Sequence, residues 1–525
     1  MKTTTQFRPA ALAAIVICLT LNSCNDAKYL TETPLDFVGP QNFYRTAGDA
    51  LAAINGVYAS FINTSGDNYY GRNFVMLVEH PTEMWTSRLS ATNERSQPDV
   101  YTIPVTHAYV QSVWASAYDA INRANSVIRR VPGIAMDTGL RSRIVAEARF
   151  LRATHYFNLV RMYGGVPLKL TETQGLDSIQ LPRNTAQDVY AQIVQDLLDA
   201  IKVLPSSKSY GSADRGRASR GAAKTLLAKV YLQRAGAGGG TPADWQASLD
   251  MSKQVVADGD YALVADPMTL FDFYGGTVVE NNSEIIFDIR NSRAPGLGGR
   301  ISSHIAPNAT APYLGASTNG SFEAESTYFA SFSPSDKRRD ATFLLSWNRN
   351  GTIVTYVPNN LATSPYASET PFPRKFLDPL MTGTGAEKPN YIILRYAEVL
   401  LMIAEAANEV ASGPTAEAYA SINQIRARAG LPNVTPGLGH DLFRDSVFVE
   451  RRWELTLEGP NGYFDSQRNW PWAKARIEFD LMKARSNSSK FPKFNGAPIP
   501  DKYKLMPIPQ RALDLNPKLT QNPGW

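Results

Sequence analysis

The stretch LRSRIVAEARFLRATHYFNLVRMYGGVPL, residues 140–168, decides the fold class of this chain. Its apolar side chains recur every three or four residues, which is the spacing of one face of an α-helix. The positions on that face are Ile144, Ala148, Leu151, Leu159 and Met162. A glycine pair and a proline follow, and these residues end helices. The sequence therefore predicts a long amphipathic helix that buries one face against other helices.

Further windows along the chain have the same helical periodicity. They are residues 47–61, 105–130, 188–204, 219–234, 245–258, 391–412, 415–429 and 441–457. Successive helices joined by short turns pack as antiparallel pairs, so we expect an α-solenoid of helical hairpins. No strict repeat period is visible in the sequence.

Two long segments interrupt the helical pattern, residues 62–104 and about 260–390. They are rich in Gly, Pro, Asn, Ser and Tyr, and they contain short strand-like runs at Glu284–Ile289 and Thr352–Val357. Long loops carried by a compact scaffold are usually functional. We therefore look for a ligand site in these segments.

The N-terminus has the layout of a bacterial lipoprotein signal. Lys2 and Arg8 precede an apolar run that ends at Leu21-Asn22-Ser23-Cys24, an ending similar to a lipobox. We expect a signal peptide over residues 1–23 and a lipid anchor on Cys24; an ordinary signal peptide with an incidental cysteine is the alternative. Loss of Lys2 and Arg8 lowers the formal charge from +5 to +3, which gives no case for nucleic-acid binding.

Catalytic and metal-binding patterns are weak in this sequence. The five histidines are scattered singly, without the spacing of a metal pair. We expect His155 to be a packed residue of a helix. His80, beside Glu79 and Glu83, is expected in a solvated loop, with metal binding as the weaker alternative. We predict no catalytic residue, no metal site and no cofactor.

Glu450, Glu454 and Glu458 recur every four residues on one predicted helix. A pair of carboxylates could serve glycoside hydrolysis. Arg451 and Arg452 lie between them, so a structural ion-pair network is the preferred interpretation. A surface glycoside hydrolase is the less favoured one.

Aromatic and polar side chains in the two loop-rich segments suit a sugar ligand. Sugars present apolar C–H faces edged by hydroxyl groups, so flat rings beside Asn and Arg match them, although the same groups could hold a peptide. Trp85 and Trp347 are the preferred exposed rings because polar residues surround them, whereas most single aromatics are core residues. The predicted ligand-binding residues are Asn68, Tyr70, Arg72, Trp85, Arg88, Tyr313, Trp347 and Arg349.

A series of motifs in fixed order resembles the RagB/SusD family of Bacteroidetes outer-membrane nutrient-binding lipoproteins. The strongest are EARFLRA at 147–153, YGGVPL at 163–168, RYAEVLL at 395–401, INQIRARAGL at 422–431 and QNPGW at 521–525. Asn55, Gly56 and Tyr58 also fit the pattern. One departure is the turn Pro460-Asn461-Gly462, which has an extra residue and lacks the family's arginine.

The resemblance implies a mainly α fold, with tetratricopeptide-like helical hairpins forming a superhelical scaffold and a loop-rich irregular region packed on it. After the signal peptide, residues 24–525 would form a single SusD-like domain, with an N-terminal part at about 24–235 and a C-terminal part at about 260–525.

The resemblance also implies a surface-exposed, lipid-anchored outer-membrane protein without catalysis. It would capture an oligosaccharide or polysaccharide and deliver it to a SusC/RagA-like TonB-dependent transporter. Peptide or glycopeptide capture is the alternative ligand class, and a purely structural subunit of the transporter complex is a further alternative.

Overall fold

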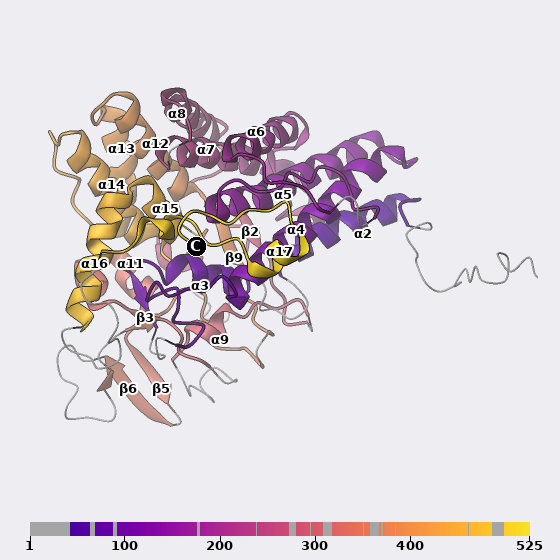
Figure 1. The fold of residues 1–525 in the computed structure, drawn as a ribbon. Coiled ribbons are helices and arrows are strands. Elements are labelled where there is room, and N and C mark those ends of the chain that lie inside the picture. The colour runs from indigo at the N-terminus through magenta and orange to yellow at the C-terminus, as the bar shows by residue number, and fades with distance from the viewer. Residues whose placement is uncertain are drawn as a thin grey trace, which may run out of the picture. The chain divides into compact units, whose positions relative to one another are not determined.

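The computed structural model describes residues 43–62, 69–87, 92–175, 179–237, 239–271, 280–294, 296–307, 318–349, 351–356, 367–368, 371–383, 385–459, 461–485 and 498–525. By its contacts the chain divides into residues 1–45 and a body over 46–525. In the first unit, the rings of Phe43 and Tyr44 meet edge-on at 4.7 Å. The expected anchor, Cys24, lies outside the described residues. The body is mainly helical, as the sequence predicts (Figure 1).

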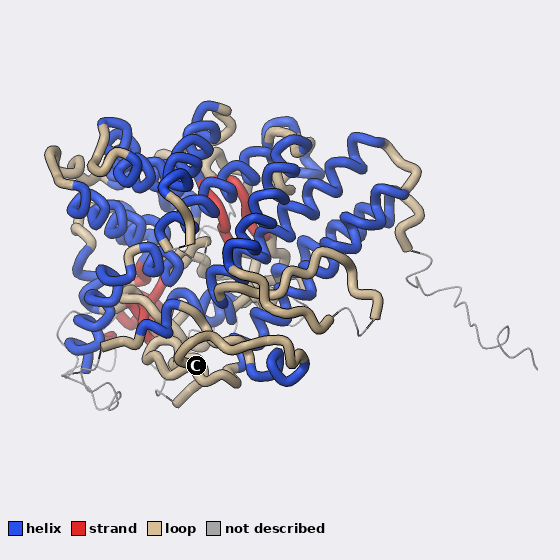
Figure 2. Tube along the Cα trace, turned by 45° about the horizontal axis from the view of Figure 1, so that its top comes forward, coloured by secondary structure: helices blue, strands red, loops and turns tan. Residues whose placement is uncertain are grey.

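Long helices stacked in chain order form the framework of the body (Figures 1 and 2). They are α2 (Ala47–Tyr58), α4 (Ala108–Arg130), α5 (Thr138–Tyr163), α6 (Ala186–Val203), α7 (Arg220–Gly236), α8 (Pro242–Ala257), α12 (Tyr396–Val410), α13 (Ala416–Ala429) and α14 (His440–Leu455). Contacts run from α4 to α5, α5 to α6, α6 to α7, α7 to α8, α8 to α12, and α12 to α13 and α14. This order of neighbours is that of stacked helical hairpins.

Local signals in the sequence explain where these helices begin and end. Thr46 caps α2 and Thr185 caps α6, each in a reciprocal capping box with the aspartate three residues later. Gly430 ends α13 in the left-handed conformation, at a φ of +77°. The predicted helices are therefore confirmed to within a few residues, with one exception.

The exception is the window 391–412, which begins as a strand. β9 (Tyr391–Arg395) pairs antiparallel with β2 (Ile285–Ile289), and α12 follows it directly. Every residue of β9 is buried, and a fully buried strand has a continuous apolar run that periodicity cannot separate from a buried helix. The strand predicted at Glu284–Ile289 is confirmed as β2.

Shorter elements cover the rest of the body. The helices are α3 (Asn73–Glu79), α9 (Ile301–Ile305), α10 (Ser326–Ser331), α11 (Lys337–Thr342), α15 (Gly462–Arg468), α16 (Trp470–Arg485) and α17 (Gln510–Leu515). The strands pair as β1 (Trp85–Thr86) with β3 (Glu323–Ala324), β4 (Phe343–Leu344) with β8 (Phe372–Pro373), and β5 (Ser346–Arg349) with β6 (Thr352–Tyr356) and β7 (Ala367–Ser368). The second predicted strand, Thr352–Val357, is confirmed over its described residues as β6.

Glu450 and Glu454 on α14, and Glu458 three residues beyond its end, belong to a buried ion-pair network. Basic partners come from other segments of the chain: Glu450 pairs with Arg338 at 2.6 Å, Glu454 with Arg395 at 2.5 Å, and Glu458 with Lys375 at 2.6 Å. Arg395 also reaches Glu284, directly before β2, at 2.8 Å. The structural interpretation of these carboxylates is confirmed, and the network fixes β2 and β9 to α14.

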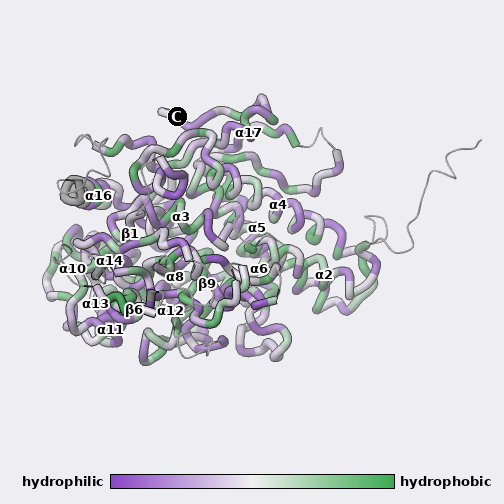
Figure 3. The backbone as a smooth tube through the Cα atoms, turned by 90° about the horizontal axis from the view of Figure 1, so that it is seen from below, coloured by the Kyte–Doolittle hydropathy of each residue, from purple (hydrophilic) through white to green (hydrophobic). Residues whose placement is uncertain are grey.

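Hydrophobic and hydrophilic residues are interspersed along the helices of the body (Figure 3). α4 and α6 bury one face and leave the other to solvent, as expected for amphipathic helices. Residues 150–163 of α5 are buried on every side, so the burial of a single face predicted for this helix is wrong over its second half. None of the described helices combines the length and the apolar character needed to cross a bilayer.

Candidate functional site

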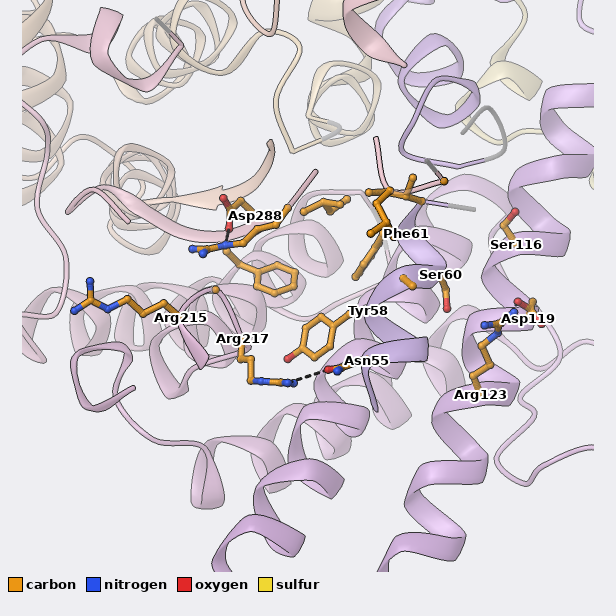
Figure 4. Close-up of a pocket in the computed structure, with 18 of the residues that line it drawn as sticks. Asn55, Tyr58, Ser60, Phe61, Ser116, Asp119, Arg123, Arg215, Arg217 and Asp288 are labelled. Atoms are coloured by element: carbon orange, nitrogen blue, oxygen red, sulfur yellow. Dashed lines mark hydrogen bonds and ion pairs between the residues drawn. The ribbon is translucent and has the colours of Figure 1, made fainter. Parts of the chain in front are cut away.

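A pocket of about 750 Å³ opens between the helical scaffold and strand β2 (Figure 4). Small-molecule sites in proteins are typically about 300–1,000 Å³. Segments far apart in the sequence line the pocket: the end of α2 with residues 59–62, one face of α4, the loop 213–217, and β2 with residues 290, 296 and 297. We call it the Tyr58 pocket.

The base of the Tyr58 pocket is apolar. The Phe61 and Phe287 rings meet edge-on at 6.2 Å and are almost fully buried, and Ile289 is buried beside them. Tyr58 lies at 6.5 Å from Phe287 and is partly exposed. The base therefore offers apolar contact and one accessible aromatic ring.

One wall of the pocket is fixed by a buried carboxylate behind Tyr58. The Tyr58 hydroxyl donates to Glu147 at 2.9 Å and accepts the backbone N–H of Ala218 at 2.9 Å. Arg217 donates to Glu147 at 3.0 Å and to Asn55 at 2.8 Å. Burial raises the pKa of Glu147, and the charge of Arg217 acts in the opposite direction.

The opposite wall is a polar face of α4. Ser112, Ala115, Ser116, Asp119 and Arg123 are spaced so that they lie along one side of the helix. Arg123 pairs with Asp119 at 2.9 Å, and both side chains are about half exposed. This wall presents hydroxyl, carboxylate and guanidinium groups that solvent, and hence a ligand, can reach.

Strand β2 supplies the third side. Asp288 is buried and accepts a hydrogen bond from Asn390 at 2.8 Å, and Arg290 donates to it at 3.4 Å. Gly216 lies against Arg290: its φ is +94°, and a Cβ there would lie 2.2 Å from the Arg290 Nε. Glycine is therefore required at this turn by conformation and by space.

The two tryptophans predicted as exposed sugar platforms are buried, so that prediction of exposure is wrong. Trp85 has no exposed surface, and its indole N–H donates to Thr456 at 2.7 Å. Trp347 is 5% exposed and packs edge-on against Phe372 at 5.1 Å. Their polar sequence neighbours indicated loops, but the rings themselves fill the space beneath those loops.

Among the predicted site residues whose side chains the structure describes, none lines the Tyr58 pocket. Tyr70 is buried, and its hydroxyl accepts a hydrogen bond from Asn158 at 2.7 Å. Arg72 lies over the Tyr109 ring at 4.9 Å, and its Nε donates to Asn73, whose side-chain amide donates to Ser112 of the pocket at 3.1 Å. Arg72 is thus the predicted residue with a connection to this site.

The remaining four predicted ligand contacts have side chains outside the described part of the structure. Asn68, Arg88 and Tyr313 lie outside the described residues. Arg349 is placed by its backbone, as the last residue of β5. Their role in binding stays a prediction.

The two histidines singled out in the sequence are both buried. His155 lies within α5 next to Tyr69, as expected, and burial lowers its pKa to about 3. His80 follows α3 directly and its Nδ1 lies 2.9 Å from the Arg95 carbonyl, so the expected solvated loop is wrong. Within the described ranges, no group of three or more potential metal-ligating side chains comes together.

A weak sequence signal for the Tyr58 pocket did exist. Asn55 and Tyr58 belong to a motif that resembles the RagB/SusD pattern, but a motif shared by a family indicates scaffold as readily as site. Phe287 and Ile289 alternate along a predicted strand. Nothing in the sequence shows that these segments meet, because their contacts are long-range.

Comparison with known proteins gives consistent matches over nearly the whole chain. The SusD family profile matches residues 206–525, and a profile described as "Starch-binding associating with outer membrane" matches residues 43–232. SusD-like protein P2 of Formosa agariphila is 27% identical over 97% of this chain and 98% of its own length. SusD-like protein P25 of the same organism is 26% identical over 95% of each chain.

Solved structures agree with these matches. A SusD homolog from Bacteroides thetaiotaomicron superposes with a TM-score of 0.79 at 28% identity, over 92% of this chain and 98% of that one. A laminarin-binding SusD-like protein has a TM-score of 0.71 at 24% identity, over 92% and 100% of the two chains, and so shares the fold. With more than half of its length matched by the family profile, the chain belongs to the SusD family.

Proposed function

We propose that this protein captures a glycan at the surface of the outer membrane and delivers it, without catalysis, to a SusC-like TonB-dependent transporter. Membership of the SusD family carries the proposal, together with the family description that links the N-terminal half to starch binding and to the outer membrane. The Tyr58 pocket is the proposed capture site.

The lining of the Tyr58 pocket suits a sugar chain. The buried base beneath Tyr58 would contact apolar C–H faces. Ser116, Asp119 and Arg123 would exchange hydrogen bonds with hydroxyl groups, because they are partly or well exposed on the α4 wall. Arg217 and Asn55 are already held by Glu147 and by each other, so this wall loses little conformational freedom on binding.

The loop residues predicted from the sequence remain proposed ligand contacts in addition to this pocket. Asn68 follows closely on Ile62, which lines the pocket, and Arg72 connects to Ser112 through Asn73. Arg88 and Tyr313 are proposed on chemical grounds alone.

A binding role without hydrolysis fits the acids around the pocket. Asp119 pairs with Arg123, Asp288 with Arg290, and Glu147 with Arg217. Each of these carboxylates is thus engaged by an arginine of the pocket lining, as expected for groups that shape a binding site.

A ligand screen with the purified full-length protein tests the proposed function. The probes are amylopectin, laminarin, xylan and polygalacturonate in affinity electrophoresis, and a tryptic digest of casein in calorimetry. We expect at least one polysaccharide to retard the protein, without release of reducing ends. Binding of casein peptides alone would favour the peptide alternative, and released reducing ends would favour a hydrolase.

The proposed location depends on Cys24. In the native bacterium, Cys24→Ala should release the protein from the membrane fraction, because a lipid anchor needs the cysteine sulfur. The wild type should stay with the membrane, be accessible to protease on intact cells, and co-purify with a SusC-like protein. Full membrane retention of Cys24→Ala would contradict the anchor.

A further inference from the structure

A second pocket, of about 500 Å³, lies between α10, α14 and α16. We propose that it is a second glycan-binding site of this protein, which takes a neutral stretch of the same polysaccharide. The inference rests on the proposed function, and it adds a site that none of the sequence motifs indicates. We call it the Trp472 pocket.

Two partly exposed tryptophans distinguish this pocket from the first. Trp453 on α14 and Trp472 on α16 both line it, and both retain accessible surface. Trp453 donates its indole N–H to Ser331 at 2.9 Å, which fixes the ring orientation. Trp472 packs against Phe448 of α14 at 5.7 Å. Two large rings that face a cavity can each stack against a sugar ring. The Tyr58 pocket has one such partly exposed ring, that of Tyr58.

A buried ion pair forms the floor of the Trp472 pocket, and its two charges cancel. Arg452 is 4% exposed and donates to Glu83 at 2.8 Å and to Ser466 at 2.9 Å. Its guanidinium lies 5.3 Å from the centre of the Trp472 ring. The buried pair therefore holds one side of the ring in place, and it adds no net charge to the pocket.

The rim carries polar groups that a ligand can reach. Arg476 is exposed and stacks on Trp472 at 4.4 Å, and among the described residues it has no carboxylate partner. Its guanidinium can therefore turn toward a hydroxyl group without breaking an ion pair. Asp445 and Ser331, on α14 and α10, complete the rim.

The balance of charge defines the ligand class. Arg452, Arg476, Glu83 and Asp445 all line the pocket, so its lining has equal numbers of formal positive and negative charges. A uronate or sulfate chain would gain no net attraction here, whereas a neutral sugar ring stacks on indole and hydrogen-bonds to both kinds of group. The combination therefore favours a neutral glycan.

The two pockets are lined by different residues and different elements. The Tyr58 pocket is lined by the end of α2, by α4 and by β2, whereas the Trp472 pocket is lined by α10, α14 and α16. Figure 3 shows α10, α14 and α16 on the side of the body away from α2. A short oligosaccharide would occupy each pocket separately. A polymer could engage both, and the second contact would then be intramolecular and would raise retention.

The test compares variants of the Trp472 pocket with matched variants elsewhere, in the full-length protein and with the four polysaccharides named above. Trp472→Ala removes a platform, and Ala475→Arg fills the pocket from an exposed position of α16. Trp245→Ala and Ala243→Arg make the same changes on α8, outside both pockets. For amylopectin, laminarin or xylan, whichever retards the wild type, we expect both pocket variants to lose about tenfold or more in apparent affinity, and the controls to keep it. Retardation by polygalacturonate alone would overturn the neutral ligand class.

Calorimetry with hexasaccharide fragments of the same polysaccharide gives the second readout. The wild type should bind at two sites per protein, and each pocket variant at one. If Ala475→Arg and Ala243→Arg are retarded equally by the polysaccharide and bind the same number of hexasaccharides, the second site is overturned. The proposed function would then still stand. Failure of all four polysaccharides to retard the wild type would overturn both proposals. Ala475→Arg keeps the test decisive if Trp472→Ala does not fold.

Discussion

Single buried residues hold together segments that are far apart in the sequence. Arg395 is the central case: it is 2% exposed and contacts Glu284, Glu454 and Glu458. It thereby connects the strand pair that carries the base of the Tyr58 pocket to helix α14. Breaking a buried ion pair leaves uncompensated charge in the interior, which costs more than the pair itself contributes.

Replacing Arg395 by methionine should therefore destabilise the protein strongly. We expect a loss of about 3–5 kcal/mol in the free energy of unfolding, measured by urea denaturation at pH 7. Arg123→Ala removes an exposed pair and should cost less than about 1 kcal/mol. Equal stability of Arg395→Met and Arg123→Ala would show that the buried network is not structural.

Glu79 is a residue whose titration affects stability. It is fully buried in α3, and burial raises its pKa to about 8, although backbone N–H groups and the charge of Arg452 act in the opposite direction. Between pH 4.5 and 8 the folded protein therefore binds a proton that the unfolded chain does not. The contribution of Glu79 to stability falls as the pH rises, by about 1.4 kcal/mol per pH unit.

Glu79→Gln should remove this pH dependence. The variant should lose less free energy of unfolding than the wild type between pH 5 and 7.5, measured by urea denaturation at four pH values. Burial also raises the pKa of Glu387 to about 8, so a residual slope should remain. Glu417→Gln, at a surface position, should keep the wild-type slope; an identical slope in Glu79→Gln would contradict the assignment.

At the scale of elements, periodicity found the amphipathic helices and failed where both sides of an element are buried. Helices such as α4 and α6 were predicted because an apolar face runs along them beside a polar one. β9 was predicted as the start of a helix because its apolar run carries no period. Trp85 and Trp347 were placed in solvent for a related reason, since sequence neighbours do not reveal what covers a side chain.

The turn before α7 provides a test at this scale. Gly216→Ala should push Arg290 out of its position, because the φ of +94° disfavours a side chain and the new Cβ would meet the Arg290 Nε. We expect a loss of about 1–3 kcal/mol in stability and weaker glycan binding. Gly211→Ala, at a φ of −63° with no atom within 4 Å, should change neither. Identical unfolding curves for the two variants would contradict this role of Gly216.

At the scale of the whole molecule, the sequence predicted the scaffold and the family but not the site. The scaffold repeats local amphipathic patterns, and each helix can be recognised on its own. The Tyr58 pocket instead combines side chains near residues 58, 116, 217 and 288, which meet only through the stacking of α2, α4 and the β2–β9 pair. Aromatic composition indicated a sugar binder without showing which rings would be accessible.

The central claim is that the captured glycan occupies the Tyr58 pocket, and one titration tests it most directly. Ala115 is exposed on the α4 wall, so Ala115→Trp fills the pocket without removing a native hydrogen bond, and Ala243→Trp makes the same change on α8. Both variants are titrated calorimetrically with hexasaccharides of the polysaccharide that retards the wild type. We predict that Ala115→Trp loses one class of site completely while Ala243→Trp binds as the wild type does. Wild-type binding by a folded Ala115→Trp variant would contradict the account.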